Sequence, residues 1–383
     1  MRFLHTADWQ LGMTRHFLQG EAQPRYSAAR RDAVAALGGL ARQTGAEFVV
    51  VAGDVFEANQ LAPRVVSQSL EAMRAIDVPV FLLPGNHDPL DASSVYTSAL
   101  FAAECPGNVR VLDGPGPWEV RPGVHLIAAP WHSKAPTTDL TAAILDGVAP
   151  GEGVRILVAH GGVDVLDPDP TKPSLIRMGR IADALERGLI HYVALGDKHS
   201  RTQVDGGGRV WYSGSPEVTN FDDIEGDPGY ALVVEIDEDD PTHPVTVDAH
   251  RLGRWRFLTL KRQVDNGRDV VDLDVNLDQL TDKERTVVRL ALTGTLTVTD
   301  RSALDACLDK YARLFADLRT WDSHTELAVL PADGEFDDLG IGGFTASAVA
   351  ELVSAAKSDD GQAAADAQGA LALLLRLTKG HAA

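Results

Sequence analysis

Five short apolar runs in this chain each end in a loop that carries an Asp, Asn or His residue, in most cases beside a glycine. The runs are rich in Val, Ile, Leu and Ala, a composition typical of strands that are covered on both faces. Segments with the apolar spacing of helices lie between them, over residues 28–41, 65–76 and 181–187. Such alternation of strands and helices, with polar residues at the strand ends, predicts a layered α/β sandwich.

The most polar of these loops follows the predicted strand at residues 78–83, where a Pro-Gly break leads directly into Asn86, His87 and Asp88. In open α/β sheets, ligands bind in the crevice at the carboxyl ends of the strands. Three adjacent side chains able to bind a metal or transfer a proton are also too costly to bury for packing alone. We therefore take this loop as the first candidate for a functional site.

The part of the chain after residue 230 has a different pattern. We expect strands over 230–236, 245–251, 257–260, 270–273 and 287–292, and an amphipathic helix over 303–318. Residues 331–339 are expected to form an acidic linker, followed by Ala/Leu-rich helices over 346–356 and 362–377. The chain is too long for one average domain, and we predict three parts: a first domain over 1–250, a smaller α+β domain over 255–330 and a C-terminal helical segment over 340–383.

The chain of 383 residues carries a formal net charge of −20, which limits the partners that it can bind alone. DNA affinity usually rests on Lys and Arg neutralising phosphates, so an acidic chain is a poor DNA binder without metal ions or a basic partner. Its two cysteines, Cys105 and Cys307, have no metal-binding spacing and are expected to be reduced thiols. No apolar run approaches membrane-spanning length and a strand-like segment begins at Arg2, so we expect a cytoplasmic protein without a signal peptide.

The strand-end residues have the chemistry that hydrolysis of a phosphate ester requires. The reaction needs an activated water, neutralisation of charge on the phosphoryl oxygens and a proton for the leaving oxygen. Two divalent ions about 3.5–4 Å apart supply the first two, and holding them takes a bridging carboxylate with several oxygen and nitrogen ligands. The strand ends offer seven such ligands: Asp8, Gln10, Asp54, Asn86, His160, Asp197 and His199. His87 remains beside them as the acid.

The order and spacing of these residues resemble the five-motif signature of the calcineurin-like metallophosphoesterases. The matching segments are Asp8-x-Gln10, Gly53-Asp54, Gly85-Asn86-His87-Asp88, Ala159-His160 and Gly196-Asp197-x-His199. Residues 5–9 and 212–217 further resemble the SbcD-type nucleases of DNA double-strand-break repair. The motifs span about residues 1–225, whereas residues past 255 resemble that family's capping domain only loosely. The resemblance implies a four-layer α/β/β/α sandwich with a smaller capping domain and C-terminal helices.

The resemblance also implies a role for each matching residue. Asp54 would bridge two divalent ions. The remaining ligands would be Asp8, Gln10 and His199 for one ion, and Asn86, His160 and Asp197 for the other. His87 would contact no metal and would protonate the leaving oxygen or steady the transition state. Asp88 would orient His87.

Two positions depart from the family's pattern, which usually has His where this chain has Gln10 and Asp197. Gln ligates only weakly through its neutral carbonyl oxygen, whereas Asp contributes a hard anionic oxygen. Both changes make the site richer in oxygen, which favours Mn²⁺ or Mg²⁺ over softer metals. We keep both residues as ligands and expect two Mn²⁺ ions, with Mg²⁺ as the alternative.

Each of these residues also has an ordinary structural explanation when it is taken singly. An Asp after a strand is usually a turn residue or a helix cap, and a lone His is usually a buried core residue. Only their joint occurrence in five successive loops indicates a site. The histidines that match no metal position are expected to be structural: His5, His125, His132 and His191.

Three functions are weighed. The first is a DNA exonuclease or endonuclease of double-strand-break repair that works with an SbcC-like SMC-type ATPase. The C-terminal helices would bind this ATPase, and the resemblance also implies a homodimer. The alternative for those helices is that they pack against this chain itself. The second function is a phosphodiesterase for nucleotides or other small phosphoesters, which the acidic charge and the two altered ligands favour. The third is a non-enzymatic scaffold with a decayed site, which the presence of His87 and Asp54 disfavours.

Overall fold

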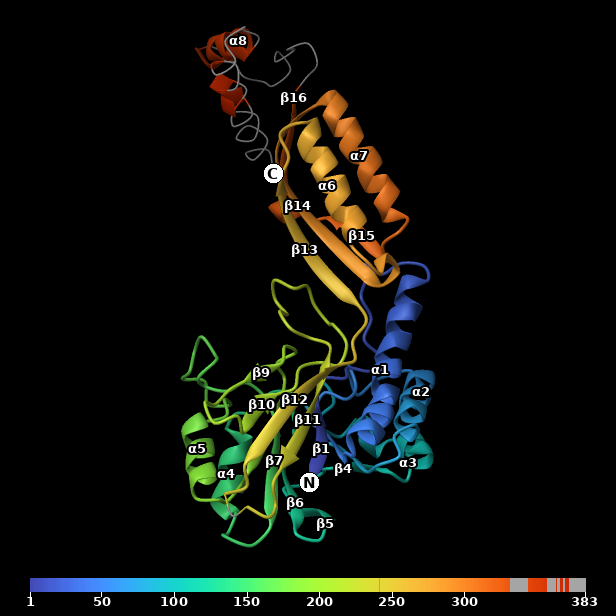
Figure 1. Cartoon of the computed structure of the whole chain (residues 1–383), viewed down its shortest axis with the longest axis vertical. Coiled ribbons are helices and arrows are strands. Elements are labelled where there is room, and N and C mark those ends of the chain that lie inside the picture. Colours follow the sequence, from blue (N-terminus) through green and yellow to red (C-terminus); the bar gives the residue numbers. More distant parts are fainter. Residues whose placement is uncertain (241, 331–343, 357–362, 364–365, 368, 372–383) are drawn as a thin grey trace. The chain divides into compact units, whose positions relative to one another are not determined.

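A computed structural model of the protein shows two compact units, Met1–Trp255 and Arg256–Ala383 (Figure 1). The structure describes residues 1–240, 242–330, 344–356, 363, 366–367 and 369–371. Within these residues the first unit contains two six-stranded sheets and the second unit contains one four-stranded sheet. No described helix combines the length and the apolar character that crossing a membrane requires.

The first sheet of the Met1–Trp255 unit has the strand order β12-β11-β1-β2-β3-β4. Its parallel strands are β1 (Arg2–Thr6), β2 (Val49–Val51), β3 (Val80–Leu82) and β4 (Val109–Val111). The other two strands, β11 (Tyr230–Ile236) and β12 (Val245–Arg251), pair in antiparallel fashion. The register pairs Thr6 with Val51 and Val51 with Leu82, so the loops after β1, β2 and β3 leave the sheet at the same edge.

The second sheet has the strand order β5-β6-β7-β8-β10-β9. Its parallel strands are β6 (Val124–Ala129), β7 (Val154–His160), β8 (Tyr192–Gly196) and β10 (Val210–Tyr212). The antiparallel edges are β5 (Trp118–Arg121) and β9 (Thr202–Gln203). Because His160 pairs with Gly196, the loops after β7 and β8 begin side by side.

The two sheets pack face to face, and helices cover the outer face of each (Figure 1). Apolar side chains from both sheets, such as Phe81 and Tyr192, form a buried layer between them. The first sheet is covered by α1 (Ala22–Thr44), α2 (Pro63–Arg74) and α3 (Ala99–Glu104). The second is covered by α4 (Leu140–Gly147) and α5 (Met178–Glu186). This arrangement confirms the predicted four-layer α/β/β/α sandwich.

Local sequence signals set the ends of the longer helices. α1 extends beyond the predicted residues 28–41 and ends at Gly45, whose φ of 70° suits a residue without a Cβ. α2 begins with Pro63 at its first position, where the missing N–H removes no helical hydrogen bond. Three short 3-10 turns complete the connections: η1 (Val95–Thr97), η2 (Lys283–Arg285) and η3 (Asp322–His324).

The Arg256–Ala383 unit is built on a parallel sheet in which β14 is the central strand. Its strands are β13 (Arg256–Gln263), β14 (Thr286–Thr297), β15 (Asp317–Thr320) and β16 (Glu326–Leu330). The chain passes through α6 (Gly267–Gln279) between β13 and β14, and through α7 (Val298–Ala312) after β14. Apolar residues of both helices pack with Leu290 of the central strand, as expected for crossovers between parallel strands.

Two predictions for this unit are wrong. The strand expected at 270–273 lies inside α6, where Val270, Leu273 and Leu277 are buried at helical spacing. The side chain of Asn266 caps this helix by accepting hydrogen bonds from the first backbone N–H groups. The helix expected over 303–318 ends at Ala312, because Leu318 belongs to β15 and pairs with Val288.

The predicted helix over 346–356 corresponds to α8 (Phe344–Ala356). The expected linker over 331–339 lies outside the described residues, as does most of the helix expected over 362–377.

Candidate metal centre

The residues predicted as metal ligands follow parallel strands of both sheets. Asp8 and Gln10 come after β1, Asp54 after β2, Asn86 after β3, and Asp197 and His199 after β8, while His160 is the last residue of β7. Backbone hydrogen bonds join these loops. The Asp8 N–H donates to Gly53 and the Gln10 N–H donates to Asp54, both through carbonyl oxygens. The Asp197 N–H donates to the Asp8 carboxylate at 3.0 Å, which connects the two sheets.

Three of the side chains converge on one point. Asp8, Asp54 and His160 each offer a ligand atom, and these atoms lie within 4.8 Å of one another. The three residues are nearly inaccessible, with exposed fractions of 0%, 2% and 3%. Two carboxylates buried this closely are unfavourable without compensating positive charge. The cluster therefore has the composition and burial of a cation site.

His160 faces several oxygens through one ring nitrogen. Its Nδ1–H donates to the carbonyl of Ala52 at 2.8 Å, which directs the Nε2 lone pair into the centre. Nε2 lies 2.7 Å from Asn86 Oδ1, 3.5 Å from Asp54 Oδ1 and 3.8 Å from Asp197 Oδ1. A lone pair on Nε2 would be repelled by these oxygens, so the arrangement is favourable when Nε2 carries a proton or when a cation lies among the atoms. The geometry thus brings Asn86 and Asp197 to the same centre as His160.

Gln10 and His199 form the other side of the centre. Gln10 Nε2 lies 3.2 Å from His199 Nε2, and Gln10 Oε1 is buried without a hydrogen-bond partner among the described residues. Such an atom costs free energy unless a ligand satisfies it. His199 Nδ1 is engaged by Thr219 Oγ1 at 2.6 Å and by Glu225 Oε1 at 3.1 Å. These contacts orient His199 so that Nε2 points toward Gln10.

Backbone strain is concentrated in the same loops. Six described residues other than glycine have a positive φ, and four of them are predicted ligands. The angles are 53° at Asp8, 42° at Gln10, 52° at Asp54 and 98° at Asp197. L-residues rarely adopt this region, and where they do, the surrounding structure holds them there, often at functional sites. The strain independently marks these four positions.

Three glycines provide the space that the centre needs. A Cβ on Gly53 would lie 2.1 Å from His160 Nδ1, and a Cβ on Gly85 would lie 2.2 Å from Asp54 Oδ1. A Cβ on Gly196 would lie 2.0 Å from the carbonyl oxygen of Ala52, which is the acceptor for His160. The glycines before the predicted ligands are therefore required for close approach as well as for turning the chain.

His87 lies at the edge of the centre and has a different orienting partner from the one predicted. We expected Asp88 to orient it, but the His87 Nδ1–H donates to the backbone carbonyl of Glu57 at 2.9 Å. Asp88 instead accepts from the Gly85 N–H at 2.8 Å, the Phe56 N–H at 2.9 Å and the Tyr96 hydroxyl at 2.5 Å. Asp88 is fully buried, so it fixes the loop backbone rather than the imidazole.

Burial and mutual charge set the protonation of the centre. Burial raises the pKa of Asp8 to about 6. Burial also opposes the charge on His160, but Asp54, Asp8 and Asp197 outweigh it and raise the pKa of this imidazole well above its ordinary value. The pKa of Asp54 is lowered, since His160 and His87 outweigh its burial. The metal-free centre thus holds protons in the place of cations.

The sequence analysis did not identify Glu57, Thr219 or Glu225. Glu225 is 3% exposed and lies among the exposed residues Asp222 and Asp223, so the sequence alone offers no sign that it differs from them. Glu57 is three residues beyond Asp54, and one of its carboxylate oxygens is buried without a hydrogen-bond partner among the described residues. Burial raises the pKa of this carboxyl. Only the loop conformations in the structure show that these residues contact the site.

Comparison with known proteins gives one family match and several relatives. Residues 1–233 match the family model of the calcineurin-like phosphoesterases. The SbcD subunit of the nuclease SbcCD of Rhodobacter capsulatus is 28% identical over 284 residues, covering 61% of this chain and 66% of that protein. The double-strand break repair protein Mre11 of Archaeoglobus fulgidus is 33% identical over 115 residues, covering 29% of this chain and 24% of that protein. Mre11 of Sulfurisphaera tokodaii is 24% identical over 262 residues, covering 65% of this chain and 64% of that protein.

The matches therefore span less than two thirds of the length of each of these relatives. Among solved structures, TT1561 of Thermus thermophilus gives a TM-score of 0.41 at 11% identity, covering 66% of this chain and 98% of that one.

Proposed function

Because the chain belongs to the calcineurin-like phosphoesterase family, we propose that it is a metal-dependent nuclease that hydrolyses phosphodiester bonds in DNA. The proposed hydrolytic activity rests on one observation, the buried cluster of Asp8, Asp54 and His160 at the edge where parallel strands of both sheets end. The preference for DNA is supported by the similarity to proteins named as nuclease and double-strand-break repair proteins.

We assign the predicted ligands to two groups that share Asp54. The groups are Asp8, Gln10 and His199 on one side, and Asn86, His160 and Asp197 on the other. The unpartnered Gln10 Oε1 and the oxygens around His160 Nε2 support this assignment. The excess of carboxylate and amide oxygens favours Mn²⁺ or Mg²⁺. Such ions supply charge neutralisation on the phosphoryl oxygens and activation of the attacking water.

His87 is proposed as the acid that protonates the leaving oxygen. Its side chain is 36% exposed, so a substrate can reach it, and its Nε2 lies 3.9 Å from Asp54 Oδ2. The Nδ1–H of His87 donates to the backbone carbonyl oxygen of Glu57. As an imidazolium, the ring therefore holds one proton at Nδ1 for Glu57 and presents the other at Nε2 to the leaving oxygen. The backbone N–H of His87 donates to Asp54 at 2.9 Å, which fixes the acid beside the centre.

A partner is proposed to supply basic surface for DNA. The chain's net charge of −20 gives little long-range attraction for a polyanion. The similarity to a protein named as a subunit of a nuclease supports an SbcC-like SMC-type ATPase as that partner. The C-terminal helical segment over 340–383, including α8, is the proposed docking element, and a homodimer is the proposed assembly.

The acidic charge also favours a second candidate, a phosphodiesterase for nucleotides or other small phosphoesters. A side-by-side assay with Mn²⁺ distinguishes the two, using end-labelled linear duplex DNA, a cyclic nucleotide and bis(p-nitrophenyl) phosphate. The nuclease proposal predicts degradation of the labelled DNA by the full chain, faster when the ATPase partner is added. Turnover of the cyclic nucleotide with intact DNA would instead establish the second candidate, and no turnover of any substrate would contradict both.

A further inference from the structure

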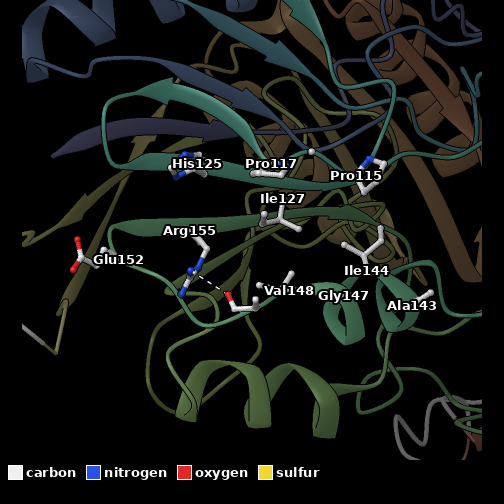
Figure 2. Close-up of a pocket in the computed structure, with 12 residues that line it drawn as sticks. Pro115, Pro117, His125, Ile127, Ala143, Ile144, Gly147, Val148, Glu152 and Arg155 are labelled. Atoms are coloured by element: carbon white, nitrogen blue, oxygen red, sulfur yellow. Dashed lines mark hydrogen bonds between the residues drawn. The ribbon is translucent and has the colours of Figure 1, made fainter.

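A cavity of about 630 Å³ lies in the Met1–Trp255 unit at a distance from the metal centre. It is bounded by the turn before β5, the strand β6, the end of α4 with the loop that follows, and Arg155 of β7 (Figure 2). We call it the β6–α4 cavity. Arg155 is five residues before His160 on the same strand, a separation of roughly 16 Å along an extended chain. None of the predicted metal ligands lines the cavity.

The walls of the β6–α4 cavity are largely apolar. Ile127, Ile144 and Val148 line it from three different segments, together with Pro115 and Pro117. α4 ends at Gly147, and a Cβ built on that glycine meets no atom within 4 Å. A larger side chain at this position is therefore free of steric clashes. A concave, mostly apolar space of this size is typical of a small-molecule site, provided that it also contains polar groups that orient a ligand.

Arg155 supplies such a group and is 8% exposed. Its Nε donates to the carbonyl of Leu189 at 2.6 Å and its Nη2 to the carbonyl of Gly188 at 2.7 Å. Nη1 has only a long contact of 3.5 Å with the carbonyl of Ala149. All three acceptors are neutral, and within the described part of the chain the guanidinium makes no ion pair. Burying a cation without a counter-ion is unfavourable, so an anion bound beside Arg155 would be stabilising.

Two other polar residues line the cavity, and neither neutralises Arg155. Glu152 is exposed, and its carboxylate points away from the guanidinium in Figure 2. His125 is half-buried on β6. The anionic end of a ligand is therefore expected beside Arg155, and its apolar part among Ile127, Ile144 and Val148.

We propose that the β6–α4 cavity binds an amphipathic monocarboxylate, a molecule with one carboxylate head and an apolar body such as a medium-chain fatty acid. A guanidinium has five N–H donors, and the three contacts above leave two for the ligand. Two donors suit the paired oxygens of one carboxylate. The volume would hold roughly 20 water molecules at their share of the liquid, which is ample for an eight- to ten-carbon chain. This site is separate from the metal centre and does not depend on the proposed function.

Calorimetric titration of the full chain with sodium octanoate tests the proposal, with 1-octanol and octylammonium chloride as probes of the head group. We expect saturable binding of one octanoate per chain, weaker binding of octanol and none of octylammonium. Arg155→Gln should remove the preference for octanoate over octanol. Gly147→Leu, which places a side chain in the open volume, should weaken octanoate binding by about tenfold or more, a loss of at least about 1.4 kcal/mol.

Gly179→Leu is the matched control, because Gly179 is an exposed helical glycine with no atom within 4 Å of a built Cβ. It should bind octanoate as the unaltered chain does. Thermal melting of all variants would show that each one folds. The proposal is overturned if octanoate shows no saturable binding at millimolar concentrations, if octylammonium binds as well as octanoate, or if Gly147→Leu binds octanoate unchanged.

Discussion

At the scale of single residues, the candidate site is defined by atoms that lack ordinary partners. Gln10 Oε1 is buried without a hydrogen bond among the described residues, and His160 Nε2 faces oxygens rather than donors. In the metal-free protein a proton on His160 compensates the oxygens around Nε2, whereas Gln10 Oε1 has no such compensation. A cation would satisfy both groups, which is why we base the metal assignment on them rather than on residue type alone.

The replacement Gln10→His tests whether this position is a simple ligand. An imidazole nitrogen is a stronger ligand than a neutral amide oxygen, so Mn²⁺ affinity and turnover of bis(p-nitrophenyl) phosphate should be kept or raised. Metal titration and steady-state rates provide the measurement. A large loss of turnover at saturating Mn²⁺ would show that Gln10 has a dedicated role that histidine cannot fill.

Glu225 is expected to act on the metal through His199. Removing its charge with Glu225→Gln should weaken Mn²⁺ binding by about 10- to 100-fold, because a carboxylate behind a histidine ligand fixes the ring and raises its basicity. Equilibrium Mn²⁺ binding followed by electron paramagnetic resonance gives the affinity directly. Asp223→Asn, two residues away and exposed, is the control and should leave the affinity unchanged. Equal effects from both replacements would exclude a specific role for Glu225.

At the scale of elements, parallel strands place the ligands and glycine-containing loops give them room. The sequence predicted the strands that precede the site because each combines a continuous apolar run with an abrupt polar end. It did not predict the short elements β4, β5, β6, β9, β15, β16, α3 and α4, which have between two and eight residues and too little length for a clear periodicity. The strand expected at 270–273 shows the opposite error, since four residues cannot distinguish a strand from one turn of α6.

The sequence could not predict which groups bind the imidazole rings of His87 and His199, and the reason is physical. Motif spacing indicates which side chains meet at a strand edge, but His87 finds Glu57 and His199 finds Glu225 through loop conformations. Those conformations include left-handed residues such as Asp54 that no propensity favours. We expected Asp88 to orient His87 because the two residues are adjacent in the sequence, but the Asp88 carboxylate accepts hydrogen bonds from other groups.

Gly85→Ala tests the steric role of the loop glycines. A Cβ at this position would lie 2.2 Å from Asp54 Oδ1, so the carboxylate must move and Mn²⁺ binding should fall sharply, together with turnover. Gly39→Ala, in α1 and with open space around a Cβ, should instead stabilise the protein by about 0.5–1 kcal/mol and leave metal binding intact. Metal titration and chemical denaturation of both variants provide the comparison. Normal Mn²⁺ affinity in Gly85→Ala would contradict the packing that we describe.

At the scale of the whole molecule, every predicted ligand lies in the Met1–Trp255 unit. The match to the family model, over residues 1–233, falls within the same unit. The predicted division into parts at 1–250, 255–330 and 340–383 stays a prediction, as does the role of the last part in binding an ATPase.

The pH dependence of stability should reveal the buried acids of the metal-free protein. Burial raises the pKa of Asp8 and of Asp88 to about 6, from an ordinary value of 3.8. The folded state then holds protons more tightly than the unfolded state, so stability falls as pH rises from about 4 to 6. Burial lowers the pKa of His5 to about 3 and of His191 to about 4, which changes stability in the opposite direction over this range, so the acids are measured by difference. In chelator, we expect the unaltered protein to lose stability relative to Asp8→Asn between pH 5 and pH 7.5, by a free energy on the order of 1 kcal/mol.

Adding Mn²⁺ should remove most of this difference, because a cation compensates the charged carboxylates. Asp8→Asn removes one of the two acids and is the reference for this comparison. An unaltered protein whose stability in chelator runs parallel to that of Asp8→Asn between pH 5 and pH 7.5 would show that the folded state does not hold a proton on Asp8 in the way the structure indicates.

The most direct test of the central claim separates metal binding from proton transfer. It measures bound Mn²⁺ per chain and turnover of bis(p-nitrophenyl) phosphate for the unaltered protein, His87→Ala and Asp54→Asn. We predict that His87→Ala keeps the full complement of two Mn²⁺ ions while turnover falls by about 10²-fold or more, and that Asp54→Asn loses both metal and turnover. Loss of metal from His87→Ala, or retention of metal and turnover by Asp54→Asn, would contradict the site that we propose.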